Sequence, residues 1–226
     1  MNTRKIATLT GWLMVVTFVT SIPAYFILYA PVRDNPALIT GTGADPTVSV
    51  GLGATLEIIL IIANVGTAVV PYALFRRYSQ SLALGYVAAR LIEGTFIAIG
   101  LVSLLTFVYM RQQGTAGTDA ALGEVFVAIY DRAFLVGPGI LAGIANGMIL
   151  GYLMYRSGLV PRGLAMLGII GGPLVAASGI AIMLGVTERG SALQGIATIP
   201  EFIWELSFGV YLIVKGLQAD SDPGPA

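Results

Sequence analysis

Long apolar stretches separated by short polar segments dominate the chain. Six of them are nearly free of charged residues, at about 7–30, 52–75, 82–110, 124–154, 163–186 and 197–217. A helix needs roughly 20 mostly apolar residues to cross the hydrocarbon core of a bilayer, and each stretch reaches that length. The pattern therefore predicts an all-α fold: a polytopic membrane bundle of six transmembrane helices, forming a single domain over residues 1–217.

The first apolar stretch follows Arg4 and Lys5, as the core of a secretory signal would. Its apolar run continues past Tyr29, which is longer than the roughly 7–15 residues of a signal peptide's apolar region. Ile22 would also occupy a position where a cleavage site needs a small side chain. We therefore expect an uncleaved first helix.

Basic residues near the ends of the stretches predict the orientation. If the N-terminus is inside, the inner side holds Arg4, Lys5, Arg76, Arg77, Arg156, Arg162 and Lys215, and the outer side holds Arg33, Arg111 and Arg189. Since cytoplasmic loops carry the excess of Lys and Arg, we expect both termini in the cytoplasm and the chain in the plasma (inner) membrane. Tyr25 and Tyr29 then fall at the outer interface, where aromatic residues are enriched.

The connecting segments are too short to hold a soluble domain. The longest, about 31–51, is rich in Gly, Pro and Thr, so we expect it to be irregular and external. Residues 218–226 are small, polar and mildly acidic, which predicts a disordered cytoplasmic tail.

Composition excludes several classes of function. Charged residues make up 11% of the 226 residues, with 12 basic against 12 acidic, whereas soluble chains average about 25%. Zero net charge lacks the basic footprint of a nucleic-acid binder, so no nucleic-acid partner is expected. With no Cys and no His, the chain lacks thiolate nucleophiles, imidazole bases and the usual zinc ligands, and we expect neither a metal site nor a cofactor.

Glycines recur at every fourth position in the fourth stretch and continue in the fifth, as Gly139, Gly143, Gly147 and Gly151, then Gly168 and Gly172. Helices in lipid associate through close backbone approach, which small residues permit. We expect these rows to meet within one chain, between the fourth and fifth helices. A homodimer interface or a groove for a partner subunit is the alternative. Pro138, just before the row, is expected to bend the fourth helix.

Apart from Glu124 and Lys215 at the ends of spans, the Asp, Glu, Lys and Arg residues within the predicted spans are Glu57, Arg90, Glu93, Asp131, Arg132, Glu201 and Glu205. A charge at the bilayer centre costs about 2.5–3.5 kcal/mol and usually marks a pair, a wet cavity or a functional site. Counted at about 1.5 Å per residue, Arg90 and Glu93 lie in the inner half, and the other five lie toward the outer half. Asp131 is close enough to the surface to be merely interfacial.

Two pairs of these residues share a helix face. Arg90 and Glu93 are three residues apart, so they either neutralise each other or present Arg90 to an anionic group that Glu93 orients. Glu201 and Glu205 are one turn apart, and two carboxylates held so close in low dielectric favour one staying protonated. We expect Arg132 to pair with Glu57 or Glu201. Three carboxylates then lack a basic partner, which suggests a proton or cation pathway.

Three regions of the sequence resemble a known family, namely Val69–Arg77 with Ala83–Gly94, Tyr155–Leu164, and Pro200–Glu205 with Leu212–Leu217. They are similar to the prokaryotic membrane family catalogued as domain of unknown function 4386. Its most specific parts here are Arg90-x-x-Glu93 and Leu159-Val-Pro-Arg162, while Tyr211 and Leu217 stand where Trp and Phe are expected. The resemblance implies a small multi-helix membrane protein without an established activity, and directs attention to Arg90, Glu93, Arg162, Glu201 and Lys215.

The loop between the fourth and fifth stretches carries Arg156, Pro161 and Arg162. Pro161 ends a helix, and the two arginines fall at the level of the lipid phosphates, where each gains about 1 kcal/mol from anionic lipid. We expect this loop to anchor the topology; a surface for a cytoplasmic partner is the alternative.

Three functions remain compatible with the sequence. The short loops and dense small-residue faces favour a non-enzymatic accessory or regulatory subunit of a larger membrane complex, contacting lipid and a membrane-protein partner or a second copy of itself. The unpaired carboxylates favour a small secondary transporter, or a proton- or cation-coupled carrier using intramembrane Glu and Arg. An intramembrane enzyme using carboxylates is the third alternative.

Overall fold

The computed structural model of the chain describes residues 2–218, and these residues form helices and connecting turns, without strands. Six helical spans are long and apolar enough to cross a membrane. The prediction of an all-α bundle of six such helices is therefore confirmed. Residues 219–226, which contain most of the predicted disordered tail, lie outside the described residues.

Each predicted stretch overlaps one span. The first is Thr3–Leu28 (α1, Thr3–Pro23; η1, Ala24–Leu28), the second Thr47–Phe75 (α3, Thr47–Val69; α4, Tyr72–Phe75) and the third Gln80–Gln113 (α5). The fourth, Ala121–Ser157, joins α6 (Ala121–Phe134), η3 (Leu135–Leu141), η4 (Gly143–Leu150) and α7 (Gly151–Ser157). The fifth and sixth are α8 (Arg162–Met183) and α9 (Ala192–Val214).

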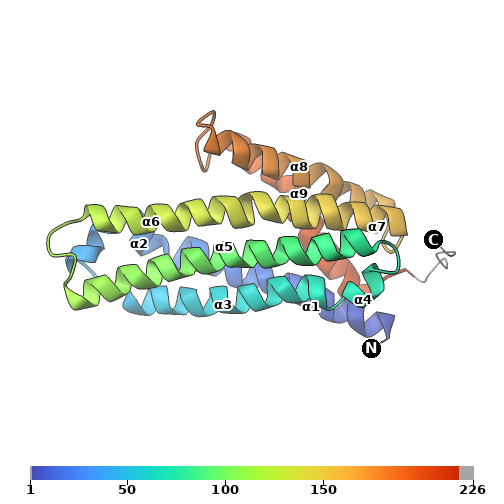
Figure 1. The fold of residues 1–226 in the computed structure, drawn as a ribbon, viewed down its shortest axis with the longest axis horizontal. Coiled ribbons are helices and arrows are strands. Elements are labelled where there is room, and N and C mark those ends of the chain that lie inside the picture. The colour runs from blue at the N-terminus through green and yellow to red at the C-terminus, as the bar shows by residue number, and fades with distance from the viewer. Residues whose placement is uncertain (1, 219–226) are drawn as a thin grey trace.

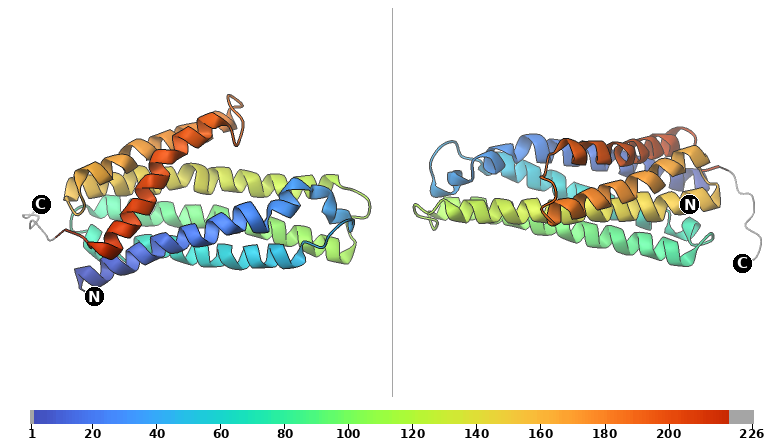
Figure 2. Two further views of the ribbon diagram at one scale, coloured as in Figure 1. Left: turned by 180° about the vertical axis from the view of Figure 1, so that it is seen from behind. Right: turned by 90° about the horizontal axis from the view of Figure 1, so that it is seen from above.

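The spans form one elongated bundle (Figure 1). α5 packs between α3 and α6, while α1 packs on α3 and on α9, and α8 packs on α9 and η4. The hairpin of α8 and α9 leans away from α6 toward its turn, so α9 crosses the bundle at a tilt (Figure 2). The start of α1 and the end of α9 lie at the same end, here named the terminal end; the opposite one is the far end (Figures 1 and 2).

Apolar side chains cover the outside of the bundle. Every span exposes large ones, for example Val19, Ile62, Val102, Val125, Ile170 and Ile196. A soluble monomer rarely exposes so much contiguous apolar surface, whereas lipid tails accept it without cost. The chain is therefore a multi-pass membrane protein.

The segment 31–51 is irregular only at 35 and 41–46, not throughout as its composition suggested. It folds into α2 (Ala30–Asp34), the 3-10 helix η2 (Pro36–Thr40) and the first turn of α3. Buried Val32, Leu38 and Ile39 pack with Phe107 of α5 in one apolar cluster. Arg111 donates hydrogen bonds to the carbonyl oxygens of 38, 42 and 43. The expectation was wrong because these few apolar residues gain burial against a neighbour that local composition does not reveal.

The fourth span is wound more loosely than an α-helix. Both η3 and η4 are π-helical, with hydrogen bonds from residue i to i+5. Pro138 lies inside η3, yet the ribbon continues from α6 to α7 without a sharp kink (Figures 1 and 2). The wider turns therefore accommodate the proline that was expected to bend the helix. Such windings often occur at functional sites.

Part of the fourth span touches α8 backbone to backbone. A Cβ atom added to Gly147 would lie 2.3 Å from the Cα of Gly172, and one added to Gly143 would lie 2.7 Å from the Gly172 carbonyl oxygen. A Cβ on Gly151 would lie 3.1 Å from the Ile169 nitrogen. Only glycine permits the first two approaches. Gly143 and Gly147 therefore contact α8 of the same chain.

Two glycines of the expected rows take other positions. A Cβ on Gly139 would meet only its own helix, the Phe134 carbonyl oxygen being nearest at 3.5 Å. The backbone of Gly168 does meet Gly151, since a Cβ added to Gly151 would lie 3.2 Å from its carbonyl carbon, but the position of its own Cβ faces α9, 2.7 Å from the Trp204 ring. Glycines four residues apart share one helix face only when about 3.6 residues make a turn. Because η3 is π-helical, Gly139 does not lie on the same face as Gly143 and Gly147.

Substituting Gly172 tests this packing. The Cβ of Gly172→Ala would lie 2.4 Å from the Gly143 carbonyl oxygen, and backbone cannot rotate away, so we expect a loss of about 1–3 kcal/mol in the free energy of unfolding. Gly163→Ala on the same helix meets nothing within 4 Å and should be neutral or stabilising by up to about 1 kcal/mol. Unfolding of both variants in detergent measures the difference. Equal stabilities would contradict the packing.

Candidate functional site

A cavity of about 140 Å³ lies inside the bundle, between the first four spans and α9. Apolar parts of its wall come from Phe18, Leu60, Phe96, Ile97 and Phe134, and polar parts from Glu57, Asn64, Arg90, Glu93, Tyr130 and Glu205. Ionisable groups from four different spans therefore border one space.

Arg90 and Glu93 of α5 pair beside this cavity. Arg90 Nη1 lies 2.7 Å from Glu93 Oε2, and Arg90 Nε donates to the Thr67 hydroxyl over 3.2 Å. The two residues are 2% and 5% exposed. Buried charges are tolerated only when paired and hydrogen-bonded, and both conditions hold here. Both alternatives expected from the sequence remain compatible with this geometry. Arg90 and Glu93 neutralise each other, and because they also line the cavity, Arg90 could face an anionic group there.

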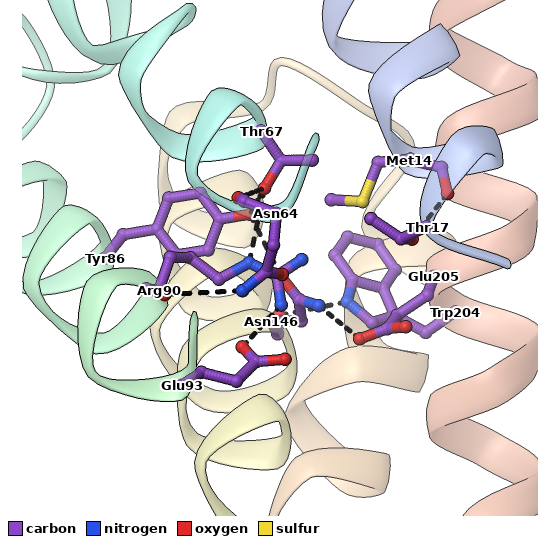
Figure 3. Close-up of polar contacts among 10 residues, drawn as sticks. All are labelled: Met14, Thr17, Asn64, Thr67, Tyr86, Arg90, Glu93, Asn146, Trp204 and Glu205. Atoms are coloured by element: carbon purple, nitrogen blue, oxygen red, sulfur yellow. Dashed lines mark hydrogen bonds and ion pairs between the residues drawn. The ribbon is translucent and has the colours of Figure 1, made fainter. Parts of the chain in front are cut away.

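Asn146 of η4 joins α5 to α9 (Figure 3). The Tyr86 hydroxyl donates to Asn146 Oδ1 over 3.0 Å, and Asn146 Nδ2 donates to Glu205 Oε1. Trp204 Nε1 donates to the Asn146 carbonyl oxygen over 3.0 Å. Side chains from α3 complete this set, which we name the central network: Asn64, Thr67, Tyr86, Arg90, Glu93, Asn146, Trp204 and Glu205.

Tyr86, Thr67 and Trp204 were not among the residues expected at the site. Tyr86 had a usable signal, because it precedes Arg90 by four residues and so shares its helix face. Thr67 and Trp204 had none, since hydroxyl and indole groups are common in apolar helices. Their partners become visible only once the helices are assembled.

Glu57 of α3 lies nearer the far end than the central network does, and two tyrosines donate hydrogen bonds to it. The hydroxyl of Tyr29 donates to Oε2 over 3.1 Å and that of Tyr130 donates to Oε1 over 3.0 Å. Glu57 is 4% exposed. Within the described chain no basic group lies within ion-pair distance of it.

The expected pairing of Arg132 with Glu57 or Glu201 is wrong. Arg132 is exposed on the outside of α6, in a hollow lined by apolar side chains such as Phe96 and Ile129. Tyr130 faces inward, and two residues turn an α-helix by more than half a revolution. Arg132 therefore points away from both carboxylates.

Asp131 instead takes part in a cluster at the far end that we name the far-end clasp, consisting of Tyr25, Arg33, Asp131 and Arg189. Asp131 Oδ1 lies 3.2 Å from Arg33 Nε and 2.6 Å from Arg189 Nη1. Both arginines also donate to the Tyr25 hydroxyl, over 2.6 and 2.7 Å. Through these contacts the clasp connects the first span, α2, α6 and the turn between α8 and α9 at the far end of the bundle.

This pairing leaves three carboxylates of the bundle interior without a basic partner among the described residues: Glu57, Glu201 and Glu205. Three unpaired carboxylates were also expected from the sequence. The reason differs, because Asp131 is paired with Arg33 and Arg189 and Arg132 pairs with none of the carboxylates. Glu205 also lies deeper than its position along the sequence suggested, because it joins the network of Arg90. Counting from residue 197 assigned it to the outer half, but α9 begins at Ala192, so Glu205 lies past the midpoint of the helix.

Glu201 lies one turn before Glu205, on the side of α9 that meets α8. It is 5% exposed, and neither carboxylate oxygen has a hydrogen-bond partner among the described residues. A Cβ added to Gly147 would lie 2.5 Å from Glu201 Oε2. Glu201 is thus outside the cavity lining but adjacent to the central network.

The loop residues lie apart from the cavity, at the terminal end. Pro161 does not end a helix as expected, because α7 already ends at Ser157 and Pro161 directly precedes α8. Lys215 directly follows α9. The guanidinium of Arg156 lies 5.9 Å from the Tyr152 ring and that of Arg162 lies 5.7 Å from the Tyr155 ring. Both arginines are exposed.

Replacing only one member of the Arg90–Glu93 pair should destabilise the bundle more than replacing both. Arg90→Met leaves a buried carboxylate without its cation, which we expect to cost about 3–5 kcal/mol of unfolding free energy. Adding Glu93→Gln removes that charge and should recover part of the loss. The measurement is unfolding in detergent, with the exposed Arg132→Met as a control that stays within about 0.5 kcal/mol of the parent. A double variant less stable than Arg90→Met would contradict this account of the pair.

Comparison with known proteins supplies a family but no activity. No curated protein and no solved structure matched the chain. One family model matched, over residues 9–216, and its description is "Domain of unknown function (DUF4386)". The match covers the cavity, the central network and the far-end clasp together. The chain therefore belongs to the family of domain of unknown function 4386, as its sequence motifs indicated.

Proposed function

We propose that the protein is a small secondary carrier, which binds a small cationic solute in the central cavity and moves it across the membrane. The observation that supports this most is the makeup of the cavity wall. Three carboxylates and one guanidinium group line it, those of Glu57, Glu93, Glu205 and Arg90. Arg90 is already bonded to Glu93, so Glu57 and Glu205 border the space without an ion pair of their own among the described residues.

A cation in the cavity would stabilise these two carboxylates. Removing a charged group from water is costly unless an opposite charge accompanies it. Tyrosine hydroxyls at Glu57 and the Asn146 amide at Glu205 supply hydrogen bonds but no positive charge. A bound ammonium group would supply it.

The aromatic lining favours an organic cation. Phe18, Phe96, Tyr130 and Phe134 border the same cavity, and aromatic faces attract ammonium groups, by about 2 kcal/mol or more where water is absent. At about 140 Å³ the cavity is smaller than the roughly 300–1,000 Å³ typical of drug-sized ligand sites. The solute that fits best is therefore a small ammonium compound.

The glycine contacts weigh against the accessory-subunit interpretation. That interpretation needs small-residue faces that are open to a partner. Gly143 and Gly147 instead lie against Gly172 of the same chain, so this part of the row offers no groove to another protein. A homodimer would have to use other surfaces.

We also infer that the terminal end faces the cytoplasm, in the plasma membrane. Arg76, Arg77, Arg156, Arg162 and Lys215 lie in or next to the connections at that end, and cytoplasmic connections carry the excess of basic residues. The cavity lies between the central network and the far-end clasp. Its solute would then enter from the outer side once the clasp opens.

The test is binding followed by transport. The protein in lipid nanodiscs is screened by calorimetry against small primary to quaternary ammonium compounds. We expect at least one to bind, and to be taken up by proteoliposomes when a pH gradient is imposed. Removing one member of a buried charge pair costs about 2–5 kcal/mol, so Glu57→Gln and Glu205→Gln should each weaken binding at least about tenfold.

The matched control is Glu124→Gln, which neutralises an exposed carboxylate of α6 and should bind and transport as the parent does. The proposal fails if no ammonium compound binds, or if both cavity variants transport normally. Recovery of a stoichiometric partner in mild detergent, together with absence of binding, would restore the accessory-subunit interpretation.

A further inference from the structure

Glu201 is the place in the described bundle where buried side-chain polar atoms have no hydrogen-bond partner. Both of its oxygens are unpartnered, and the residue is 5% exposed. An ionised carboxylate without donors is among the most costly groups to bury, since several kcal/mol of lost hydration go uncompensated. The surroundings of Glu201 therefore have to explain how it is tolerated.

Glycine surrounds this carboxylate on two neighbouring helices. Cβ atoms added to Gly147 and Gly171 would lie 2.5 and 2.9 Å from Glu201 Oε2. Glycine has no side chain that donates a hydrogen bond, and both residues lie inside helices, where the backbone N–H groups are already used. The niche is therefore tight, and it provides no group that stabilises a negative charge.

The nearest ionisable groups do not compensate for a charge on Glu201. Glu205 on α9 and Glu93 on α5 act against an ionised Glu201, while Arg90 on α5 acts in its favour. Arg90 is bonded to Glu93, and the donors of Asn146 go to Glu205. The stretches of α8 and η4 against which Glu201 packs contain no ionisable side chain.

We infer that Glu201 is a proton-binding site that holds its proton in this conformation. One proton added to the carboxylate gives a neutral carboxylic acid, which removes the uncompensated charge without requiring a new partner. The observations behind this are the missing hydrogen bonds, the glycine niche and the commitment of nearby donors to other groups.

The role of this proton in transport rests on the proposed function. Glu201 and Glu205 are one turn apart on the same helix face, so a negative charge on one opposes a charge on the other. A cation bound at Glu205 would reduce this repulsion and make loss of the Glu201 proton easier. Because such coupling is reciprocal, loss of the proton would strengthen cation binding. The arrangement therefore favours exchange of one proton for one cation.

Infrared spectroscopy of the protein in nanodiscs at neutral pH tests the proton site without any solute. A protonated, non-hydrogen-bonded carboxylic acid gives a C=O stretching band that carboxylates and amides lack. We expect this band in the parent and in Glu124→Gln, and its loss in Glu201→Gln. An identical spectrum of parent and Glu201→Gln in this region overturns the inference.

A second variant covers the case in which Glu201→Gln does not fold. Glu201→Asp keeps the acid but shortens it, so the band should persist at a shifted frequency, and an unchanged band counts against the assignment.

The exchange stoichiometry follows from calorimetry of ammonium binding in two buffers of different ionisation enthalpy. One proton released by the parent and none by Glu201→Gln is expected; equal release by both overturns the coupling. If no cation binds, the infrared result still decides the proton site, and only the proposed function fails.

Discussion

The contact of Gly147 with Gly172 is the constraint on which the rest of the site depends. With no side chain between the two backbones, α8 lies directly on the π-helical part of the fourth span. Because α9 packs on α8, this closeness brings Trp204 within hydrogen-bonding distance of the Asn146 carbonyl oxygen and sets Glu201 against Gly147. One small-residue contact thus positions a hydrogen-bond network, a carboxylate lining the cavity and a carboxylate without partners.

Charge is distributed unevenly along the bundle. At the far end, two arginines share Asp131 and Tyr25, so charges there are mutually satisfied. Beside the cavity, one arginine serves one glutamate, and Glu57 and Glu205 have only uncharged donors. A chain with zero formal net charge therefore has an acidic interior, which is the property that a cation-binding and proton-binding site requires. Without His or Cys, carboxylates are the groups available for that task.

Sequence reasoning reached the architecture because a membrane imposes it: each span needs a long apolar stretch, and these stretches are visible locally. It also placed Arg90 and Glu93 on one face, since i,i+3 neighbours on a single helix need no tertiary information. It failed where the answer depended on how helices face each other. Arg132 was assigned to the interior without knowing which side of α6 turns inward, and the contacts of Tyr25 with Arg33 and of Tyr29 with Glu57 had no local signal. The start of α9 at Ala192, before the apolar stretch begins, likewise made the expected depth of Glu205 wrong.

The central claim, that the cavity attracts cations, has a direct test because the chain contains no cysteine. Ser21 lines the cavity, and Ser21→Cys changes little more than one atom. The rate at which this thiol reacts with a cationic reagent is compared with its rate toward an anionic reagent of the same size. The account predicts faster reaction with the cation, and loss of that preference when Glu57 and Glu205 are both changed to Gln. Equal rates in the parent, or a preference for the anion, would contradict it.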